Sequence, residues 1–411
     1  MTIKTFYKKG TRKAGKILGR IIPFNTRYKP ADVCRLTPDN AAGINKREVK
    51  MHTIYQDAVT TLDISEELYN ACSPYWKPDR SVTSTYMVVE VPNGRIHTDN
   101  ESSVSVITQY NRVVENVSLS LINGKVAEPN LNNIFEQRFF TRPHKLTGTV
   151  FSMLTGGAGI NNISHWFLDV LPRLHLLRES GLYDQVDWFL VPSLKYDYQV
   201  ETLELLGIPK KKMVAGDKFA HVSADCIIAS TAPRGNHTLV PRWLCDYIRN
   251  SFVPKAKAAS NVKIAPDTPL IYISRSDSNV RNILNENELV ERLTKEGFVN
   301  VISSKLSIPE KIALFSQARI VVGATGAGMI NMLFCTPGTR VIEIFNENFV
   351  VEPFFDIATK ADLDYDYVIC KGNGKVSNMT QGQTRHFKVD VDQVLKTVKE
   401  MKALKYVYQT A

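Results

Sequence analysis

Two patterns of apolar and polar residues divide the chain. Between about residues 50 and 150, short runs rich in β-branched and aromatic residues are separated by polar loops, and Asn-Gly pairs follow two of these runs. Such runs and pairs are typical of strands joined by hairpin turns. From about residue 151, short apolar runs alternate with segments in which apolar residues recur every three or four positions. We therefore expect a β-rich first portion, followed by strands that alternate with helices around a parallel sheet.

The alternating region has two parts, separated by a stretch rich in Pro, Ala and Lys at residues 254–269. Two such halves joined by a linker favour a cleft between them, where ligands usually bind. The predicted fold class is therefore α/β, with two Rossmann-like domains facing a cleft and a β-rich N-terminal portion. In the second half the pattern predicts strands at 270–274, 299–302, 319–323 and 340–345, and helices at 286–296, 309–317 and 327–335.

The length of 411 residues fits two domains of about 150–200 residues each. A hydrophobic content of 44% supplies two cores and excludes collagen-like, disordered and coiled-coil proteins. The expected parts are a basic amphipathic leader at 1–30, an N-terminal domain at 31–253, a linker at 254–269, a C-terminal α/β domain at 270–388, and a C-terminal helical segment at 389–411 that packs back on the N-terminal domain.

Positive charge is concentrated at the N-terminus. Residues 1–30 hold nine Lys or Arg and no acid, which leaves only +1 of the formal net charge of +10 for the rest of the chain. A nearly neutral body argues against a nucleic-acid partner. As a helix, residues 1–22 place apolar side chains on one side and four basic residues, spaced four apart, on another. This favours contact with an anionic membrane surface, with a solvated basic tail and a transit peptide as alternatives.

The cysteines and the basic leader indicate in which cellular compartment the protein is expected. Six cysteines are scattered without a C-x-x-C pair, so we expect reduced thiols and no structural zinc. Glycines interrupt the leader, which therefore lacks the roughly 7–15 consecutive apolar residues of a signal peptide. No stretch approaches the roughly 18 uninterrupted apolar residues of a membrane-spanning helix. We expect a cytoplasmic protein that binds peripherally to the inner face of the cell membrane.

A glycine-rich turn follows a strongly apolar strand in the second half. Its residues include Gly323, Thr325, Gly326, Ala327 and Gly328, and the predicted helix begins at Ala327. Backbone N–H groups at a helix start bind phosphate, and a threonine hydroxyl adds a further donor. The spacing G-x-x-G-x-G differs from the dinucleotide fingerprint G-x-G-x-x-G. We expect phosphate contact without nicotinamide chemistry; a purely structural turn and an NAD(P)-dependent reductase are the alternatives.

Two arginines lie near the end of a neighbouring strand. Arg275 ends the run that begins at Ile271, and Arg281 follows in the loop before a helix. Loops at the carboxyl ends of parallel strands are where such folds bind ligands. Two guanidinium groups suit a diphosphate, whose departure they can stabilise without a metal. Surface ion pairs with Asp277 or Glu286 are the alternative.

A second glycine run, at 156–159, leads into a helix that carries His165 and Asp169. These residues are four apart and therefore share one helix face. Either group can act as a general base that takes a proton from an acceptor hydroxyl, and the residues leave open which of them does. A buried His with a hydrogen-bonded Asp that only shapes the loop is the alternative.

These motifs resemble those of glycosyltransferase family 61. Residues 162–173 look like the family's N-x-x-H-W-x-x-D-x-L-P-R signature. In the second half, five further features follow in the family's order. They are Y-I-S-R, Arg281, the S-x-x-E-x-I-x-L-F run from Ser307, the V-G-x-x-G-A-G turn and P-G-x-x-V-I-E ending at Glu343. The resemblance covers about residues 150–350, whereas the first 130 residues match no family that we can name.

The resemblance implies a two-domain GT-B architecture, a nucleotide-sugar donor that is UDP-linked, and inversion at the anomeric carbon. No cofactor is implied. It assigns the base to His165 or Asp169, the donor diphosphate to Arg275, Arg281, Gly323, Thr325, Gly326, Ala327 and Gly328, the donor nucleoside to Glu343 and Glu310, and the acceptor side or its loop to Asn161, Asn162, Trp166 and Arg173. One residue departs from the pattern. Thr325 stands where family members usually have His, which puts donor preference or activity in doubt.

A D-x-D motif lies within Asp362–Asp366, between a predicted helix and a short strand. We interpret it as a solvated loop, so metal-independent chemistry is predicted. The leading hypothesis is an inverting glycosyltransferase that acts on a cell-surface polysaccharide or lipid-linked glycan, in bacterial capsule or lipopolysaccharide biosynthesis. The alternative is a non-catalytic scaffold that binds nucleotide sugars in a glycan-assembly complex.

Overall fold

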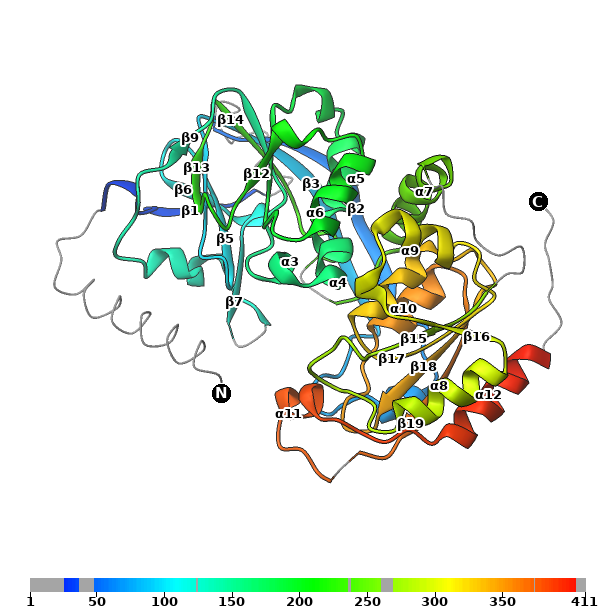
Figure 1. Cartoon of the computed structure of the whole chain (residues 1–411). Coiled ribbons are helices and arrows are strands. Elements are labelled where there is room, and N and C mark those ends of the chain that lie inside the picture. The colour runs from blue at the N-terminus through cyan, green and yellow to red at the C-terminus, as the bar shows by residue number, and fades with distance from the viewer. Residues whose placement is uncertain are drawn as a thin grey trace.

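The computed structural model describes residues 26–36, 48–122, 125–235, 238–259, 269–372 and 374–403. Its architecture is mixed α/β with three sheets (Figure 1). Two sheets and their helices form the N-terminal part, and the third sheet with its helices forms the C-terminal part. The prediction of an α/β fold with a β-rich N-terminal portion is confirmed in this form. The expected membrane contact of residues 1–22 lies outside the described residues.

The first sheet has eight strands, in the order β1-β6-β5-β4-β13-β9, with β7 paired to β5 and β8 paired to β7. It packs face to face on the second sheet, because Ile96 and Val106 share one core with Val89 and Ile227. The strands are β1 (Asp32–Cys34), β4 (Arg95–Thr98), β5 (Ser103–Ile107), β6 (Arg112–Val114), β7 (Leu119–Ile122), β8 (Lys125–Val126), β9 (His144–Lys145) and β13 (His221–Ser223).

The second sheet has six strands, in the order β12-β11-β10-β14-β3-β2. The first four are parallel, and β3 and β2 extend the sheet antiparallel. The chain steps from β10 to β11 and β12, then returns to β14 on the other side of β10, so strand order reverses between β10 and β14. The strands are β2 (Lys50–Thr61), β3 (Ser81–Pro92), β10 (Thr149–Ser152), β11 (Trp188–Val191), β12 (Met213–Ala215) and β14 (Cys226–Ser230).

Helices cover the face of the second sheet that points away from the first. The segment after β10, expected to contain one helix that carries His165 and Asp169, forms a chain of short helices. The helices are α3 (Ala158–Asn161), α4 (Ile163–His165), the π-helical η5 (Trp166–Val170), α5 (Arg173–Glu179), α6 (Asp197–Leu205) and α7 (Arg242–Ala259).

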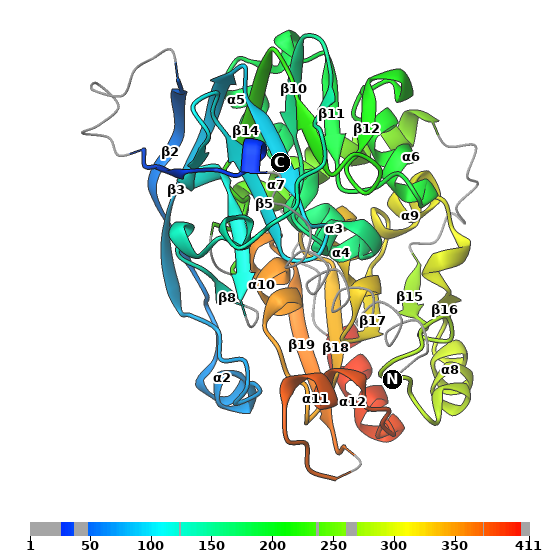
Figure 2. The same cartoon turned by 90° about the vertical axis from the view of Figure 1, so that its left-hand side faces the viewer.

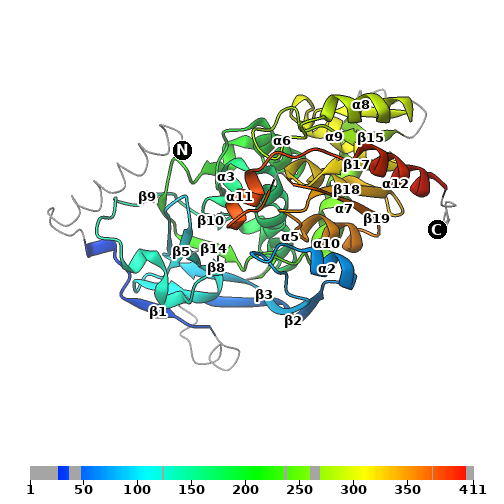
Figure 3. The ribbon, with the colours of Figure 1, turned by 90° about the horizontal axis from the view of Figure 1, so that it is seen from below.

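The third sheet has five parallel strands, in the order β16-β15-β17-β18-β19. Strand order reverses between β15 and β17. Helices α8 and α12 cover one face (Figure 3), and α9, η9 and α10 cover the other, which faces the N-terminal part. The elements are β15 (Leu270–Ile273), α8 (Glu286–Lys295), β16 (Phe298–Val301), α9 (Ile308–Phe315), β17 (Ile320–Ala324), η9 (Ala327–Phe334), β18 (Arg340–Asn346), α10 (Pro353–Lys360), β19 (Asp364–Cys370), α11 (Met379–Thr384) and α12 (Val391–Ala403).

One hydrophobic core joins the two parts. Phe167 on η5, Phe252 on α7 and Phe334 on η9 are fully buried and pack edge to face. An arm between β2 and β3, which contains α2 (Glu66–Ala71), reaches to β19 (Figure 2). The Ser73 N–H on this arm donates to the Val350 carbonyl at 2.9 Å. The two parts are therefore packed together at two separate places.

Two predicted boundaries are corrected by the structure. Helix α7 runs through Pro254 to Ala259, inside the expected linker, because Phe252 anchors its last turns in the shared core; residues 260–268 lie outside the described ranges. Helix α12 does not pack back on the N-terminal part, since its buried apolar side chains all belong to the core around β18, β19 and α8. Within the described ranges, no helix combines the length and hydropathy needed to cross a membrane.

Candidate functional site

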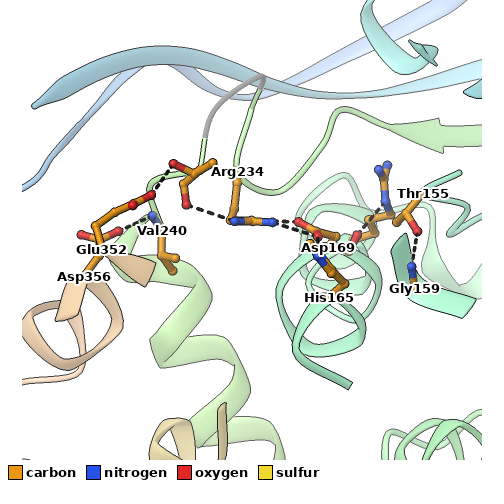
Figure 4. Close-up of polar contacts among 10 residues, drawn as sticks. Thr155, Gly159, His165, Asp169, Arg234, Val240, Glu352 and Asp356 are labelled. Carbon is orange, nitrogen blue, oxygen red and sulfur yellow. Dashed lines mark hydrogen bonds and ion pairs between the residues drawn. The ribbon is translucent and has the colours of Figure 1, made fainter. Parts of the chain in front are cut away.

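The glycine run after β10 brings His165 and Asp169 to the carboxyl edge of the second sheet (Figure 4). Gly159 allows close packing here, because a Cβ at this position would lie 2.6 Å from Cγ2 of Val170. Nδ1 of His165 lies 2.6 Å from Oδ2 of Asp169. The two residues predicted as alternative bases are therefore direct hydrogen-bond partners.

Arg234 completes this cluster from the loop after β14. Its Nε and Nη2 donate to Oδ1 and Oδ2 of Asp169 at 2.8 and 2.9 Å. Burial disfavours the charged form of Asp169, but the charge of Arg234 and the hydrogen bond from His165 outweigh it and hold the pKa of Asp169 well below its ordinary value. Both carboxylate oxygens are occupied. Asp169 is therefore a poor proton acceptor.

His165 keeps one ring nitrogen available. An ionised carboxylate only accepts hydrogen bonds, so Nδ1 of His165 carries the proton directed at Asp169. Nε2 then carries the lone pair, and 41% of the side chain is exposed. In the described part of the chain, no residue hydrogen-bonds to Nε2. The pair thus presents a proton acceptor that a carboxylate holds in orientation.

Two residues predicted for the acceptor side have structural partners instead. Trp166 is fully buried, and its Nε1 donates to the Thr202 hydroxyl at 2.9 Å. Arg173 is also buried and donates to the backbone carbonyls of Asp169 and Ser230 at 3.0 and 2.8 Å. Trp166 therefore belongs to the core, and Arg173 ties the helical segment to β14.

The two asparagines of the same prediction differ from each other. Asn162 caps α4, because its Oδ1 accepts from the Ser164 N–H at 2.9 Å. Asn161 is exposed at the end of α3. Of the four residues predicted for the acceptor side or its loop, Asn161 is the one with an exposed side chain.

The arginines and the second glycine-rich turn meet where strand order reverses in the third sheet. Strand β15 leads to Arg275, and the paired strand β17 leads to the turn. The Thr325 carbonyl accepts from Nη1 of Arg275 at 3.3 Å and from Nε of Arg281 at 3.2 Å. Arg281 also lies over the ring of Phe349, 4.6 Å from its centroid. The structure thus brings the residues predicted for the diphosphate into one place.

The two guanidinium groups are used differently. Arg275 is 8% exposed and holds its own loop, donating to the Arg281 and Val280 carbonyls and the Ser278 hydroxyl. Nη2 of Arg281 makes no hydrogen bond to any residue in the described ranges. Burial, followed by the charge of Arg275, lowers the pKa of Arg281 to about 10. No described carboxylate forms an ion pair with either group, and two guanidinium groups that share one carbonyl acceptor suit an anion.

Gly326 lets Arg275 lie against the turn, because a Cβ at this position would lie 1.9 Å from Nη1 of Arg275. We expect Gly326→Ala to weaken nucleotide-sugar binding by about tenfold in titration calorimetry, since displacing Arg275 disturbs the shared carbonyl. Gly338→Ala is the control. That position has open space but a φ of +78°, so the variant loses stability without losing affinity. Unchanged affinity in Gly326→Ala would contradict this role of the glycine.

The carboxylates of both residues predicted for the donor nucleoside are occupied by hydrogen bonds within the protein. Glu343 is fully buried, and its two oxygens accept from the hydroxyls of Thr325 and Tyr365, both at 2.7 Å. It offers no unpaired carboxylate oxygen to a ribose, and the Thr325 hydroxyl points to Glu343 rather than to a phosphate. Glu310 caps α9 by accepting from the N–H and hydroxyl of Ser307, each at 2.8 Å.

The D-x-D motif is a turn followed by a strand, not a loop throughout. Asp362 has a φ of 57° and forms an exposed ion pair with Nη1 of Arg242 at 2.7 Å. Strand β19 begins at Asp364 and contains Asp366, whose Oδ1 accepts from the Tyr367 N–H at 2.7 Å. These carboxylates are therefore spread along a strand edge.

The two clusters adjoin through packed helices. Helix α4, which ends at His165, contacts η9, which begins within the glycine-rich turn. The loop after β14 adds a second connection, because the Thr238 hydroxyl donates to Glu352 at 2.7 Å and the Val240 N–H donates to Asp356 at 2.6 Å (Figure 4). The loop that carries Arg234 is thus fixed to α10 of the C-terminal part.

Sequence reasoning missed Arg234 and Tyr365. Arg234 lies in the loop after the buried strand at 226–230, as Arg275 lies in the loop after β15, so the signal that singled out Arg275 also applies here. Tyr365 has no such signal. Its role depends on the register that places β19 beside β18, which apolar periodicity does not define.

Comparisons with known proteins agree with these clusters. The family Glycosyltransferase 61 matches residues 163–342. Protein O-linked-mannose beta-1,4-N-acetylglucosaminyltransferase 2 of Takifugu rubripes is 30% identical over 122 residues, which are 28% of this chain and 20% of that protein. The chain therefore spans about a fifth of the length of this relative. The crystal structure of the bacterial iron-containing dodecameric glycosyltransferase TibC from enterotoxigenic E. coli H10407 has a TM-score of 0.32 against this chain. The identity is 10%, and the match covers 93% of this chain and 99% of that one.

The matched range contains His165, Asp169, Arg275, Arg281 and the glycine-rich turn. The family match and the named relative bear out the predicted family and, at the level of the family, the predicted class of enzyme. Over residues 163–342, the chain is similar to glycosyltransferase family 61.

Proposed function

We propose that this chain is an inverting, metal-independent glycosyltransferase of GT-B architecture, which moves a sugar from a nucleotide-sugar donor to a hydroxyl group. The observation that carries the proposal is the placement of two groups on parts that pack together through α4 and η9. One is the imidazole of His165, oriented by Asp169. The other is the guanidinium of Arg281, whose Nε and Nη1 bond to backbone carbonyls and whose Nη2 has no hydrogen bond within the described ranges. Each lies beside the point where strand order reverses in a parallel sheet, the usual place for ligands in such folds.

The geometry supports a single displacement. The acceptor oxygen forms a bond to the anomeric carbon as the bond from that carbon to the diphosphate oxygen breaks. Nε2 of His165 takes the hydroxyl proton, and Asp169 stabilises the resulting imidazolium through Nδ1. Arg281 stabilises the negative charge of the departing diphosphate, with Arg275 holding its loop. The low pKa of Asp169 favours His165 as the base.

A UDP-linked sugar is the proposed donor, and UDP-N-acetylglucosamine is the first to test because the relative above is named as an N-acetylglucosaminyltransferase. For the acceptor we propose a hydroxyl of a cell-surface polysaccharide or lipid-linked glycan, as in bacterial capsule or lipopolysaccharide assembly. The basic composition of residues 1–30 supports a place at the inner face of an anionic membrane.

The test is release of the nucleotide (UDP, GDP or CMP) by purified protein from UDP-, GDP- and CMP-linked sugars, with and without EDTA. We expect release from one UDP-sugar, undiminished by EDTA, and a melting temperature raised by that ligand through mass action. Release from none of these donors would contradict the transferase. Loss of release in EDTA would contradict metal independence.

A non-catalytic scaffold that binds nucleotide sugars is the second candidate. One observation favours it: Thr325, where family members usually have His, gives its hydroxyl to Glu343 and not to the ligand side. The scaffold is supported if a nucleotide sugar raises the melting temperature but no nucleotide is released from it in the presence of acceptor glycans.

A further inference from the structure

A buried carboxylate lies directly under the glycine-rich turn. Glu343 is 0% exposed on β18, and its only hydrogen-bond donors in the described ranges are the hydroxyls of Thr325 on β17 and Tyr365 on β19. No described lysine or arginine forms an ion pair with it. A buried carboxylate held by two neutral hydroxyls is costly to ionise, so its protonation state responds to nearby charge.

Thr325 connects this carboxylate to the donor arginines. The Thr325 hydroxyl donates to Glu343, and its N–H donates to the Ile344 carbonyl at 3.0 Å. Its own carbonyl accepts from both Arg275 and Arg281. Thr325 thus hydrogen-bonds to the Glu343 carboxylate through its side chain and to both guanidinium groups through its backbone carbonyl. A change in the charge of Glu343 therefore reaches the anion site, formed by Arg275 and Arg281, through the single residue Thr325.

The charges around Glu343 set the direction of the effect. Burial raises the pKa of Glu343 to about 7, against the lowering by the two hydroxyls and by the charge of Arg281. Other titratable or charged groups on the surrounding elements include Arg275 on the loop after β15, Arg340 on β18, Asp364, Asp366, Tyr367 and Cys370 on β19, Asp356 and Lys360 on α10, and Glu66, Glu67 and Tyr69 on α2, whereas η9 carries none. Arg281 is the one nearby cation that both favours ionised Glu343 and faces the anion site.

We propose that Glu343 is a positioning residue of the donor site that takes up a proton when a nucleotide sugar binds, so that donor affinity falls as the pH rises through neutrality. This inference rests on the proposed function, because it assumes that the arginines bind the donor. A bound pyrophosphate places negative charge beside Arg281. The positive charge of Arg281 then no longer offsets the negative charge of Glu343. The neutral, protonated carboxyl of Glu343 therefore becomes favoured.

The sign follows from linkage. Binding of the pyrophosphate raises the pKa of Glu343, so protonation of Glu343 must strengthen binding of the pyrophosphate by the same factor. Affinity is therefore highest below the pKa of Glu343 in the free protein and falls above it. It levels off above the pKa of Glu343 in the complex. A shift of one pKa unit on binding corresponds to a tenfold loss of affinity, about the size we expect.

Titration calorimetry with UDP-N-acetylglucosamine from about pH 6 to pH 8.5 tests this, in two buffers of different ionisation enthalpy. The pyrophosphate of this probe is a diester with no group that titrates in the range, so any proton taken up enters the protein. We expect the wild-type Kd to weaken about tenfold across the range, with proton uptake on binding. Glu343→Gln, which has no titratable group, is expected to bind with no pH slope and no proton uptake.

Tyr365→Phe provides an independent variant. It removes one of the two hydroxyls that favour the ionised carboxylate, so the midpoint of the pH dependence is expected to move to higher pH. Tyr367→Phe is its matched control on the same strand, since Tyr367 does not bond to Glu343 and the midpoint stays in place. If Glu343→Gln does not fold, the midpoint of Tyr365→Phe decides.

The outcomes separate the two proposals. Absence of binding by the wild-type protein to every UDP-, GDP- and CMP-sugar, at every pH, overturns the donor site and the proposed function with it. Binding of a nucleotide sugar without a pH slope, or an equal slope in wild type and Glu343→Gln, overturns the role of Glu343 alone. A midpoint that stays fixed in Tyr365→Phe overturns it as well.

Discussion

Replacement of His165 by alanine is expected to lower kcat by about 10²–10⁴-fold, because the acceptor hydroxyl loses the base that takes its proton. The Kd for the nucleotide sugar should stay within about twofold, since His165 lies in the N-terminal part and forms no contact with Arg275 or Arg281. Release of nucleoside diphosphate at saturating donor and acceptor measures kcat. Titration calorimetry measures the donor Kd on the same preparations.

His144→Ala is the matched control. His144 lies on β9 of the first sheet, where its ring stacks on Phe219 with centroids 4.3 Å apart, and its loss should leave kcat unchanged. Asp169→Asn gives the complementary test. It leaves both His165 and Arg234 without a charged partner and should also lower kcat. Full activity in His165→Ala together with an inactive Asp169→Asn would make Asp169 the base.

Loss of Arg281 is expected to have the largest effect on donor binding. Its Nη2 is the guanidinium nitrogen that the described residues leave without a hydrogen bond, so we expect it to contact the diphosphate. A hydrogen bond from a charged donor contributes about 1.5–3 kcal/mol. Arg281→Ala should therefore raise the Kd for the nucleotide sugar about 10- to 100-fold, measured by calorimetry at low ionic strength.

Two further variants show whether the loss of affinity is specific to Arg281. Arg292→Ala removes an exposed arginine of the same part, paired with Asp392 at 3.0 Å, and should leave the donor Kd unchanged. Arg275→Ala should lower the melting temperature as well as the affinity, because Arg275 holds the loop that carries Arg281. Wild-type affinity in Arg281→Ala would place the diphosphate away from this arginine.

The C-terminal part illustrates what sequence patterns predict well. Strands β15, β17 and β18 lie within one or two residues of the predicted runs, because each is a short apolar segment bounded by turn residues. Arg275 and the glycine-rich turn were singled out by their position after such strands. That reasoning needs only local sequence and the rule that parallel strands present their carboxyl ends at one edge.

Contacts between segments that are distant in the chain could not be predicted from the sequence. The first sheet joins β4 to β13, more than a hundred residues later, and no periodicity defines that pairing. The choice between His165 and Asp169 depended on Arg234, which is 65 residues from Asp169 in the chain. Burial of Glu343 likewise depended on Tyr365. Each of these requires knowledge of which strands become neighbours, which propensity does not supply.

The shared core of Phe167, Phe252 and Phe334 has a consequence for engineering. Exchange of the C-terminal part with that of a relative, to change the donor sugar, would cut through packed aromatic side chains and not through a flexible joint. A chimaera with its junction at residues 260–268 would have to import η9 together with the faces of η5 and α7 that it packs against. Donor preference and acceptor preference in this protein are therefore not separable modules, and changing one means redesigning the interface that supports both.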